Sequence, residues 1–442
     1  MQEIRHVEIG DVLRARDERA WHQQDMLSRH GCPLISFTMN IAGSVKYDAA
    51  IERAFREGQQ RIARELERMH VRVLERLETI AFTGCECLWT VQGEAGEIKR
   101  RMCLIEESDE LGRLFDIDVL GADGSHLTRN EERRCLICSG PVRACARSRA
   151  HSVEELSART HQIIQAFFED RWVRRIGEWA QKAILFEAVT TPKPGLVDCA
   201  NNGSHSDMDL FSFLSSASAL RSYFEDCARL GLESADWQRL QHRGRLAEDD
   251  MFSAAQANTH KGAIFALGIL CCALGRTGME ASLDEICGCA AQAGEYYLSQ
   301  LKSASSHLTG GECQYRDHGL TGARGEAAGG FHTVRTVSLP ALESALAQGK
   351  SLNDAGLEAL HALMACVQDS NIICRAGLEG QRWVRESVEH ASAAPADMRE
   401  LDEQFIARRI SPGGSADLLA VTYFFHFVLT DSQNGKEAYG RD

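Results

Sequence analysis

The residues best suited to chemistry lie in short polar segments, rich in glycine, in the second half of the 442-residue sequence. These segments are residues 191–198, 203–209, 258–262, 309–312, 324–326 and 411–417. Each places an acid, a base or a glycine beside a predicted loop-to-helix junction. Free backbone N–H groups at such junctions bind anions. The pattern therefore predicts an active site for a polyphosphate, built from loops between helices.

Two of these segments lead directly into apolar runs that predict helices. Lys261 and Gly262 open one run, and Gly413 and Gly414 precede another. The positive end of a helix dipole favours phosphate, and glycine lets a ligand approach the backbone closely. An ordinary helix cap with a surface lysine is the alternative for each segment. The predicted phosphate-binding residues of this half are Lys193, Asn258, Lys261, Gly262, Arg324, Arg375, Gly413 and Gly414.

Acidic side chains of the same segments predict a magnesium site. Asp207, Asp209 and Glu312, with Asp369 further along the chain, offer the hard oxygen ligands that Mg²⁺ takes when it also holds phosphates. For any single carboxylate, a solvated loop residue is the commoner explanation. His260 lies in the densest segment, which favours a functional role over a structural one. No Gly-x4-Gly-Lys-Ser/Thr pattern is present, so the chain is not a P-loop enzyme.

In this order, the motifs resemble those of the triphosphoribosyl-dephospho-CoA synthase family across about residues 176–429. The resemblance implies an all-helical fold that transfers the triphosphoribosyl group of ATP to the 2′-hydroxyl of 3′-dephospho-CoA and releases adenine. It implies metal and acid/base work for a set of carboxylates and phosphate contacts for Lys193, Lys261, Arg324 and Arg375. That carboxylate set is Asp198, Asp207, Asp209, Glu312 and Asp369. Two departures, Ala-Ala-Gln-Ala at 254–257 and Asp-Ser-Asn at 369–371, bear on substrate affinity more than on the reaction.

In the first half, two acids lie on a predicted strand. Asp116 and Asp118 alternate with Phe115, Ile117 and Val119, so a period of two puts both carboxylates on one face. Such a pair can hold Mg²⁺ for attack on a phosphate, or it can simply face solvent. A loop between a strand and a helix carries further candidates for phosphate binding. These are Asn40, Gly43 and Lys46, joined by Arg113.

Three cysteines and a histidine form a second candidate metal site. Cys135, Cys138, Cys145 and His151 have the spacing C-x2-C-x6-C-x5-H. Three thiolates and an imidazole can bind Zn²⁺ tetrahedrally. A cluster of buried, reduced cysteines is the alternative.

About residues 8–155 resemble the apo-citrate lyase phosphoribosyl-dephospho-CoA transferase family. The matching segments are residues 40–46, 112–119, 134–138 and 145–151. The resemblance implies attachment of a prosthetic group to a serine of the acyl carrier subunit of citrate lyase, with release of diphosphate. Attack of that serine on the α-phosphate would suit a metal held by Asp116 and Asp118.

The elements that must position these residues differ between the two halves. In the first half, the patterns predict helices at 11–30 and 48–77 and strands at 34–41, 86–91, 102–105 and 113–120. In the second half, helical periods predict residues 153–189, 210–230, 261–274, 283–301, 333–347, 353–368, 377–392 and 416–429. We therefore expect an α+β domain over 1–160, with a mixed, nucleotidyltransferase-like sheet, and an all-α domain over 170–442.

Composition excludes several other classes of function. The formal net charge of −14 speaks against a general nucleic-acid or acidic-membrane binder. The N-terminus has no apolar signal sequence, and the apolar run at 262–274 is too short for a membrane span. Sixteen cysteines without a secretion signal predict reduced thiols and a cytoplasmic location.

The two resemblances describe consecutive reactions, so each supports the other. They predict a bifunctional enzyme that makes and installs the citrate lyase prosthetic group. Its substrates would be ATP and 3′-dephospho-CoA, with Mg²⁺ as a cofactor, and its partner the apo acyl carrier subunit. One alternative is that only one half is active, and another is a non-catalytic chaperone that binds the acyl carrier. The carrier of malonate decarboxylase is the alternative client.

Overall fold

The computed structural model describes residues 5–129, 133–301, 315–316 and 319–438. Its chain divides into two units, Met1–Asp170 and Arg171–Asp442. The helix α5 (Val153–Val189) has the predicted bounds; it begins in the first unit and ends in the second. Glu312, a predicted site residue, lies outside the described residues.

The first unit is built on a four-stranded sheet with the order β2-β3-β1-β4. The strands are β1 (Leu34–Met39), β2 (Arg72–Ala81), β3 (Gly84–Gln92) and β4 (Phe115–Leu120). All neighbouring strands are antiparallel, so the prediction of a mixed sheet is wrong. The strands β1 and β2 run parallel and are connected through a helix, but β3 lies between them. The strands β3 and β4 are likewise parallel and connected through a helix, and β1 lies between them.

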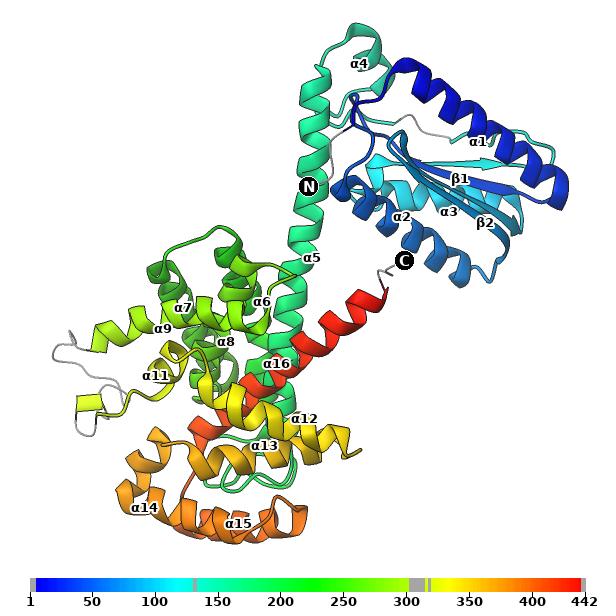
Figure 1. The fold of residues 1–442 in the computed structure, drawn as a ribbon. Coiled ribbons are helices and arrows are strands. Elements are labelled where there is room, and N and C mark those ends of the chain that lie inside the picture. The colour runs from blue at the N-terminus through cyan, green and yellow to red at the C-terminus, as the bar shows by residue number, and fades with distance from the viewer. Residues whose placement is uncertain (1–4, 130–132, 302–314, 317–318, 439–442) are drawn as a thin grey trace. The chain divides into compact units, whose positions relative to one another are not determined.

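Helices cover both faces of this sheet (Figure 1). On one face, Met26 of α1 (Ile9–His30) packs against Leu34, Leu88 and Leu120. On the other face lie α2 (Ala49–Arg68) and α3 (Ala95–Glu107). There the rings of Phe37 and Phe55 stack at 4.9 Å. The unit also contains the short helices η1 (Gly112–Leu114) and α4 (Val142–Ser148).

Two predicted elements of this unit are wrong. The helix predicted at 48–77 ends at Arg68, because His70 takes a positive φ of 53° and the chain then enters β2. The strand predicted at 102–105 lies inside α3. Its apolar residues Met102 and Ile105 join Ile98 on one buried helical face, so the short run had been read with the wrong period.

In its described residues, the second unit contains helices and no strand. They are α6 (Leu210–Leu232), α7 (Trp237–Ala255), α8 (Lys261–Thr277), α9 (Leu283–Leu301), α11 (Gly322–Ala328), the π-helix η2 (Val334–Ser338), α12 (Leu339–Ala347), α13 (Leu352–Cys366), α14 (Ser370–His390), α15 (Pro395–Arg408) and α16 (Gly413–Ala438). The all-helical expectation thus agrees with this unit. The helices α7, α11 and α15 were not predicted, and α14 begins earlier than predicted, with a break at Gly377 (φ 65°).

The apolar helix α8 forms the centre of the second unit. It packs against α6, α7, α9 and α16, and its residues from Ala266 to Gly275 are all buried. Burial on every side explains why its sequence is apolar all round rather than amphipathic. The N-terminus of α8 is thereby held in place, and it carries the segment His260–Gly262.

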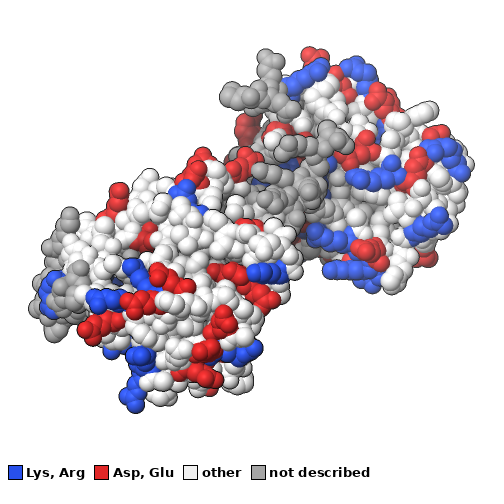
Figure 2. Space-filling model, turned by 60° about the horizontal axis from the view of Figure 1, so that its bottom comes forward, with Lys and Arg blue, Asp and Glu red and all other residues white. Residues whose placement is uncertain are grey.

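Acidic and basic side chains are interspersed over the visible face of the molecule (Figure 2). No described helix has the length and apolar character needed to cross a bilayer.

Candidate active sites

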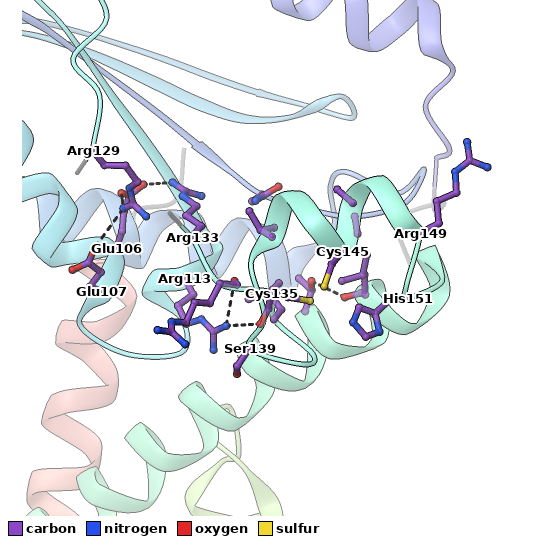
Figure 3. A pocket seen from close by; sticks show the side chains of 18 residues that line it. Glu106, Glu107, Arg113, Arg129, Arg133, Cys135, Ser139, Cys145, Arg149 and His151 are labelled. Carbon is purple, nitrogen blue, oxygen red and sulfur yellow. Dashed lines mark hydrogen bonds and ion pairs between the residues drawn. The ribbon is translucent and has the colours of Figure 1, made fainter. Parts of the chain in front are cut away.

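An arginine-lined pocket of about 640 Å³ lies in the first unit (Figure 3). Its charged lining residues are Glu106, Glu107, Arg113, Arg129, Arg133, Arg134 and Arg149. Figure 3 shows Arg129, Arg133 and Glu106 at one end and Cys135, Cys145 and His151 at the other. The excess of guanidinium groups over carboxylates suits a phosphorylated ligand.

Glu106, at the C-terminal end of α3, holds one end of this pocket together. Its side chain is almost fully buried, accepts a hydrogen bond from the Ile117 N–H at 2.9 Å, and forms ion pairs with Arg133 and Arg129. Burial raises the pKa of Glu106 although the charges of the two arginines oppose that rise. One carboxylate thus positions two guanidinium groups at this end of the pocket.

Asp116 and Asp118 lie on β4 opposite Thr38 and Ser36, as the alternation predicted. The carboxylate of Asp116 accepts a hydrogen bond from Arg133 at 2.9 Å, which links it to the pocket, and Asp118 is exposed. Within the described part of the chain, no three acidic side chains come close enough together to ligate a metal. Metal binding by this pair therefore stays a prediction.

The other phosphate ligands predicted in this unit are divided between the pocket and the loop beside it. Asn40 and Arg113 line the pocket. Arg113 donates to the Cys135 carbonyl at 2.9 Å and pairs with Glu110 at 2.7 Å. Lys46 instead donates to the Ile41 carbonyl, and burial lowers its pKa. Gly43 has a φ of 89°, which the loop requires of glycine.

The structure brings Cys135, Cys138, Cys145 and His151 together, as the spacing predicted. The four candidate ligand atoms all lie within 4.8 Å of one another. They form the only such group of three or more metal-ligating side chains found in the described residues.

In the second unit, a buried ion pair joins the loop after α5 to α5 itself. The Lys193 ammonium contacts both the carbonyl and the carboxylate of Glu187 at 2.5 Å, and its side chain is 1% exposed. Lys193 is therefore not the surface lysine that a phosphate-binding role first suggests. Glu187 was missed from the sequence because it lies in a long helix without a surrounding motif.

Asp198 organises the same loop. Its carboxylate oxygens accept hydrogen bonds from the backbone N–H groups of Lys193 (2.8 Å), Ala200 (2.7 Å) and Asn201 (3.1 Å). Asp402, on α15, accepts from the Gly195 N–H and the Asn201 side chain. These contacts give Asp198 a structural role, and its predicted catalytic role stays a prediction.

His260 lies at the N-terminus of α8 and is 2% exposed. Its Nδ1 contacts the Ser216 hydroxyl at 2.6 Å, while Nε2 has no hydrogen-bond partner among the described residues. Burial, and then the charge of Lys193, lowers the pKa of His260 to about 3. The imidazole is therefore neutral, with one buried nitrogen available to a ligand.

Two aspartates, the buried Asp369 and the half-buried Asp417, join α14 and α16 to this region. Asp369 caps α14 and accepts the Ser415 N–H at 2.8 Å, beside Gly414. Asp417 lies so close to the N-terminus of α8 that a Cβ on Gly262 would be 1.8 Å from its Oδ2. Burial, followed by the charges of Glu187 and Asp369, raises the pKa of Asp417 well above its usual range.

Lys193, Glu187, His260, Asp369 and Asp417 therefore form one polar cluster, which we call the α8 cluster. It gathers four helices or their termini around Gly262 and Gly414. Sequence reasoning chose neither Glu187 nor Asp417. For Asp417 a signal was available, because it ends the glycine-rich segment at 411–417.

A second group lies around His205. The Nε2 of His205 contacts the Ser411 hydroxyl at 2.8 Å, and its Nδ1 lies 3.9 Å from the carboxylate of the exposed Asp207. Arg375 donates a hydrogen bond to the carbonyl of the adjacent Ser204 at 3.2 Å. Burial, followed by the charge of Arg375, lowers the pKa of His205. The predicted residues Arg375 and Asp207 are thus brought to the 411–417 segment.

The remaining predicted residues occupy more peripheral positions. Asp209 caps α6, and the Ser212 N–H lowers its pKa. Lys261 is exposed and pairs with Glu248 at 2.7 Å, and Asn258 is exposed. Arg324 lies half-buried on α11, and Gly413 approaches Asn371.

Each unit thus carries its own group of titratable side chains, as expected of a two-domain enzyme. Two family models match this division. Residues 173–436 match ATP:dephospho-CoA triphosphoribosyl transferase, and residues 7–167 match apo-citrate lyase phosphoribosyl-dephospho-CoA transferase.

Two known relatives align with nearly the whole chain, and a third aligns with 66% of it. Protein CitXG of Haemophilus influenzae is 32% identical over 95% of this chain and 96% of its own. Protein CitXG of Leuconostoc mesenteroides is 28% identical over 94% of this chain and 96% of its own. The 2-(5''-triphosphoribosyl)-3'-dephosphocoenzyme-A synthase of Haemophilus ducreyi is 38% identical over 66% of this chain and 99% of its own.

The chain therefore belongs to both families and is a bifunctional transferase of citrate lyase prosthetic-group biosynthesis. Both resemblances drawn from the motifs are confirmed.

Proposed function

We propose that the second unit converts ATP and 3′-dephospho-CoA into 2′-(5″-triphosphoribosyl)-3′-dephospho-CoA and adenine. The first unit then transfers phosphoribosyl-dephospho-CoA to a serine of the apo acyl carrier subunit of citrate lyase and releases diphosphate. The observation that carries the proposal is the pairing, on one chain, of a family that makes this intermediate with a family that consumes it.

The first reaction exchanges substituents at C1′ of the ATP ribose. The 2′-hydroxyl oxygen of dephospho-CoA forms a bond to C1′ while the bond from C1′ to adenine breaks through an oxocarbenium-like state. The hydroxyl proton passes to a carboxylate of the predicted catalytic set, and the leaving adenine takes up a proton. We assign that second proton to Asp417, because burial and the charges of Glu187 and Asp369 favour its protonated form.

His260 and the helix N-termini would orient the substrate for this step. The unpartnered Nε2 of His260 can exchange a hydrogen bond with it, and the N-termini of α8 and α16 can bind its phosphates. Arg375 and Lys261 would add positive charge at the edges of the site.

Mg²⁺ would enter the first reaction with the triphosphate. Asp207 and Asp209 offer hard oxygen donors of the kind that Mg²⁺ takes together with phosphate oxygens and water. When bound, Mg²⁺ neutralises phosphate charge.

The second reaction joins the carrier serine to the α-phosphate. The serine oxygen forms a bond to phosphorus, the bond to the diphosphate breaks, and the serine proton passes to a carboxylate. The arginine-lined pocket would hold the phosphates, and Asp116 is linked to this pocket through its hydrogen bond with Arg133. Asp116 and Asp118 would hold Mg²⁺ in a nucleotidyltransferase-like manner.

Two substitutions separate the reactions. Asp417→Asn should abolish adenine release from ATP and dephospho-CoA but leave carrier modification intact when the triphosphoribosyl intermediate is supplied. Glu106→Gln should leave adenine release unchanged and slow carrier modification by about 10–100-fold, because Arg129 and Arg133 lose their common anchor.

Glu97→Gln is the matched control for Glu106→Gln, since it lies on the same helix but outside the pocket. Loss of both activities in Glu106→Gln, with the fold intact, would contradict the division of labour between the units.

A further inference from the structure

We propose that Cys135, Cys138, Cys145 and His151 bind one zinc ion in a closed, four-ligand structural site that forms an end of the arginine-lined pocket. The proposal goes beyond the two transfer reactions and does not depend on them, because metal content is measured without substrate.

The positions of the ligand atoms suit a tetrahedral ion. Zn–S bonds of about 2.3 Å place two thiolates of one tetrahedral zinc about 3.8 Å apart. In the structure the four ligand atoms lie within 4.8 Å of one another, and the sulfurs of Cys138 and Cys145 are 3.3 Å apart. Shifts of about 1 Å or less therefore complete the coordination.

The backbone is folded to bring these side chains together. A tight turn, with hydrogen bonds from the Cys135 N–H to the Gly140 carbonyl (2.7 Å) and from the Ser139 N–H to the Cys135 carbonyl (3.1 Å), places Cys138 beside Cys135. Ser139 takes a φ of 58°, which costs energy for a residue other than glycine. The N–H groups of Ile137 and Cys138 donate to the Cys135 sulfur.

The other two ligands are delivered by α4 and the reversal that follows it. Cys145 lies on α4, and Arg149 ends this helix in a left-handed conformation with a φ of 48°. The Ala150 N–H donates to the Cys145 carbonyl at 3.1 Å, so the chain folds back and places His151 next to Cys145. Two non-glycine residues with positive φ thus flank the cluster.

His151 gives an independent indication of a ligand. Its Nε2 is buried, yet it has no hydrogen-bond partner in the described part of the chain. Buried polar atoms are almost always satisfied, so such an atom calls for a partner that is a ligand, an ion or water. A disulfide between Cys138 and Cys145 would leave the His151 Nε2 and the Cys135 thiol without such a partner.

The site would position the pocket rather than take part in chemistry. Four protein ligands leave no open coordination position for substrate. Arg113 donates to the Cys135 carbonyl at 2.9 Å, and Arg134 precedes Cys135 directly. Zinc therefore fixes the backbone on which two of the pocket's arginines depend.

The test is the zinc content of the full chain after purification under reducing conditions without chelators. The zinc is measured by inductively coupled plasma mass spectrometry. We expect about one zinc per chain in the wild type and less than about 0.2 in Cys138→Ser and in Cys145→Ser. Cys32→Ser is the matched control, because Cys32 lies in the same unit but outside the cluster, and it should retain the zinc. Cys138→Ser should release adenine at the wild-type rate, whereas its rate of carrier modification should fall by about 10–100-fold.

A second measurement needs no variant that might fail to fold. Wild-type chain loaded with Co²⁺ should show the absorption of a tetrahedral thiolate complex. A wild type that takes up neither metal, or that carries a disulfide between Cys138 and Cys145 instead, overturns the proposal. So does a folded Cys138→Ser chain that holds as much zinc as the wild type.

Discussion

Gly262→Ala places a methyl group directly against the carboxylate of Asp417. Gly262 lies in the first turn of α8, and its added Cβ would be 1.8 Å from Asp417 Oδ2 and 2.5 Å from Cγ. Ordinary contact begins at 3.4 Å, so the carboxylate must move by about 1.6 Å, which is 3.4 minus 1.8. The substitution thus displaces one member of the α8 cluster and removes no polar group.

The two consequences differ in size. Overpacking costs about 1–3 kcal/mol, and the higher helix propensity of alanine returns up to about 1 kcal/mol. For a unit of this size the net change lowers Tm by about 0–8 °C. A misplacement of about 1 Å at a reacting group costs on the order of 100-fold in rate, so adenine release should fall at least that far.

The assay compares two alanine variants of helical glycines. Gly288→Ala, in α9, is the control, because an added Cβ there meets nothing within 4 Å. It should keep or slightly raise Tm and release adenine at the wild-type rate. Equal adenine release by Gly262→Ala and Gly288→Ala would refute the placement of Asp417 at the reacting centre.

The other predictions concern pH. Burial and the charges of Glu187 and Asp369 raise the pKa of Asp417, so its ionisation destabilises the fold as pH rises through that pKa. Relative to the wild type, Asp417→Asn should therefore raise Tm more at about pH 8 than at about pH 5, because only the wild type loses this contribution to stability as pH rises; a Tm difference that is the same at both pH values would contradict the raised pKa. Because the pKa of His260 is about 3, His260→Asn should lower the rate of adenine release without removing an inflection from its pH profile between about pH 5 and 8. The disappearance of an inflection near neutral pH in that variant would mean that His260 titrates there.

Several features of the fold could be predicted because local pattern determines them. The helices at α5 and α9 have the predicted bounds, and Asp116 and Asp118 alternate with buried residues of β4 as expected. The helix predicted at 48–77 failed because Val73 and Leu77 fit a helical period equally well. Only the hairpin between β2 and β3 decides their structure.

The unpredicted helix α7 has few buried residues. In α7, only Leu240, Ala247 and Met251 are buried, so its sequence has no continuous apolar stripe that would predict a helix. The helix α15 begins at Pro395, and proline is well tolerated in the first turn of a helix.

The sequence predicted many of the residues that make up the candidate site, but not the contacts that each of them makes. Motifs named Asp198 and Asp369, yet their oxygens accept backbone N–H groups whose identity depends on the fold. Asp369 meets Ser415, which is 46 residues away along the chain. Likewise, Glu187 joins the site only because the loop after α5 folds back and brings Lys193 into an ion pair with it.

The central claim is that one chain makes the prosthetic group and installs it. Its most direct test is the intact mass of the apo acyl carrier subunit of citrate lyase after incubation with this protein, ATP, Mg²⁺ and dephospho-CoA. We predict a gain equal to one phosphoribosyl-dephospho-CoA group, together with free adenine. An unmodified carrier with no adenine released would contradict the claim.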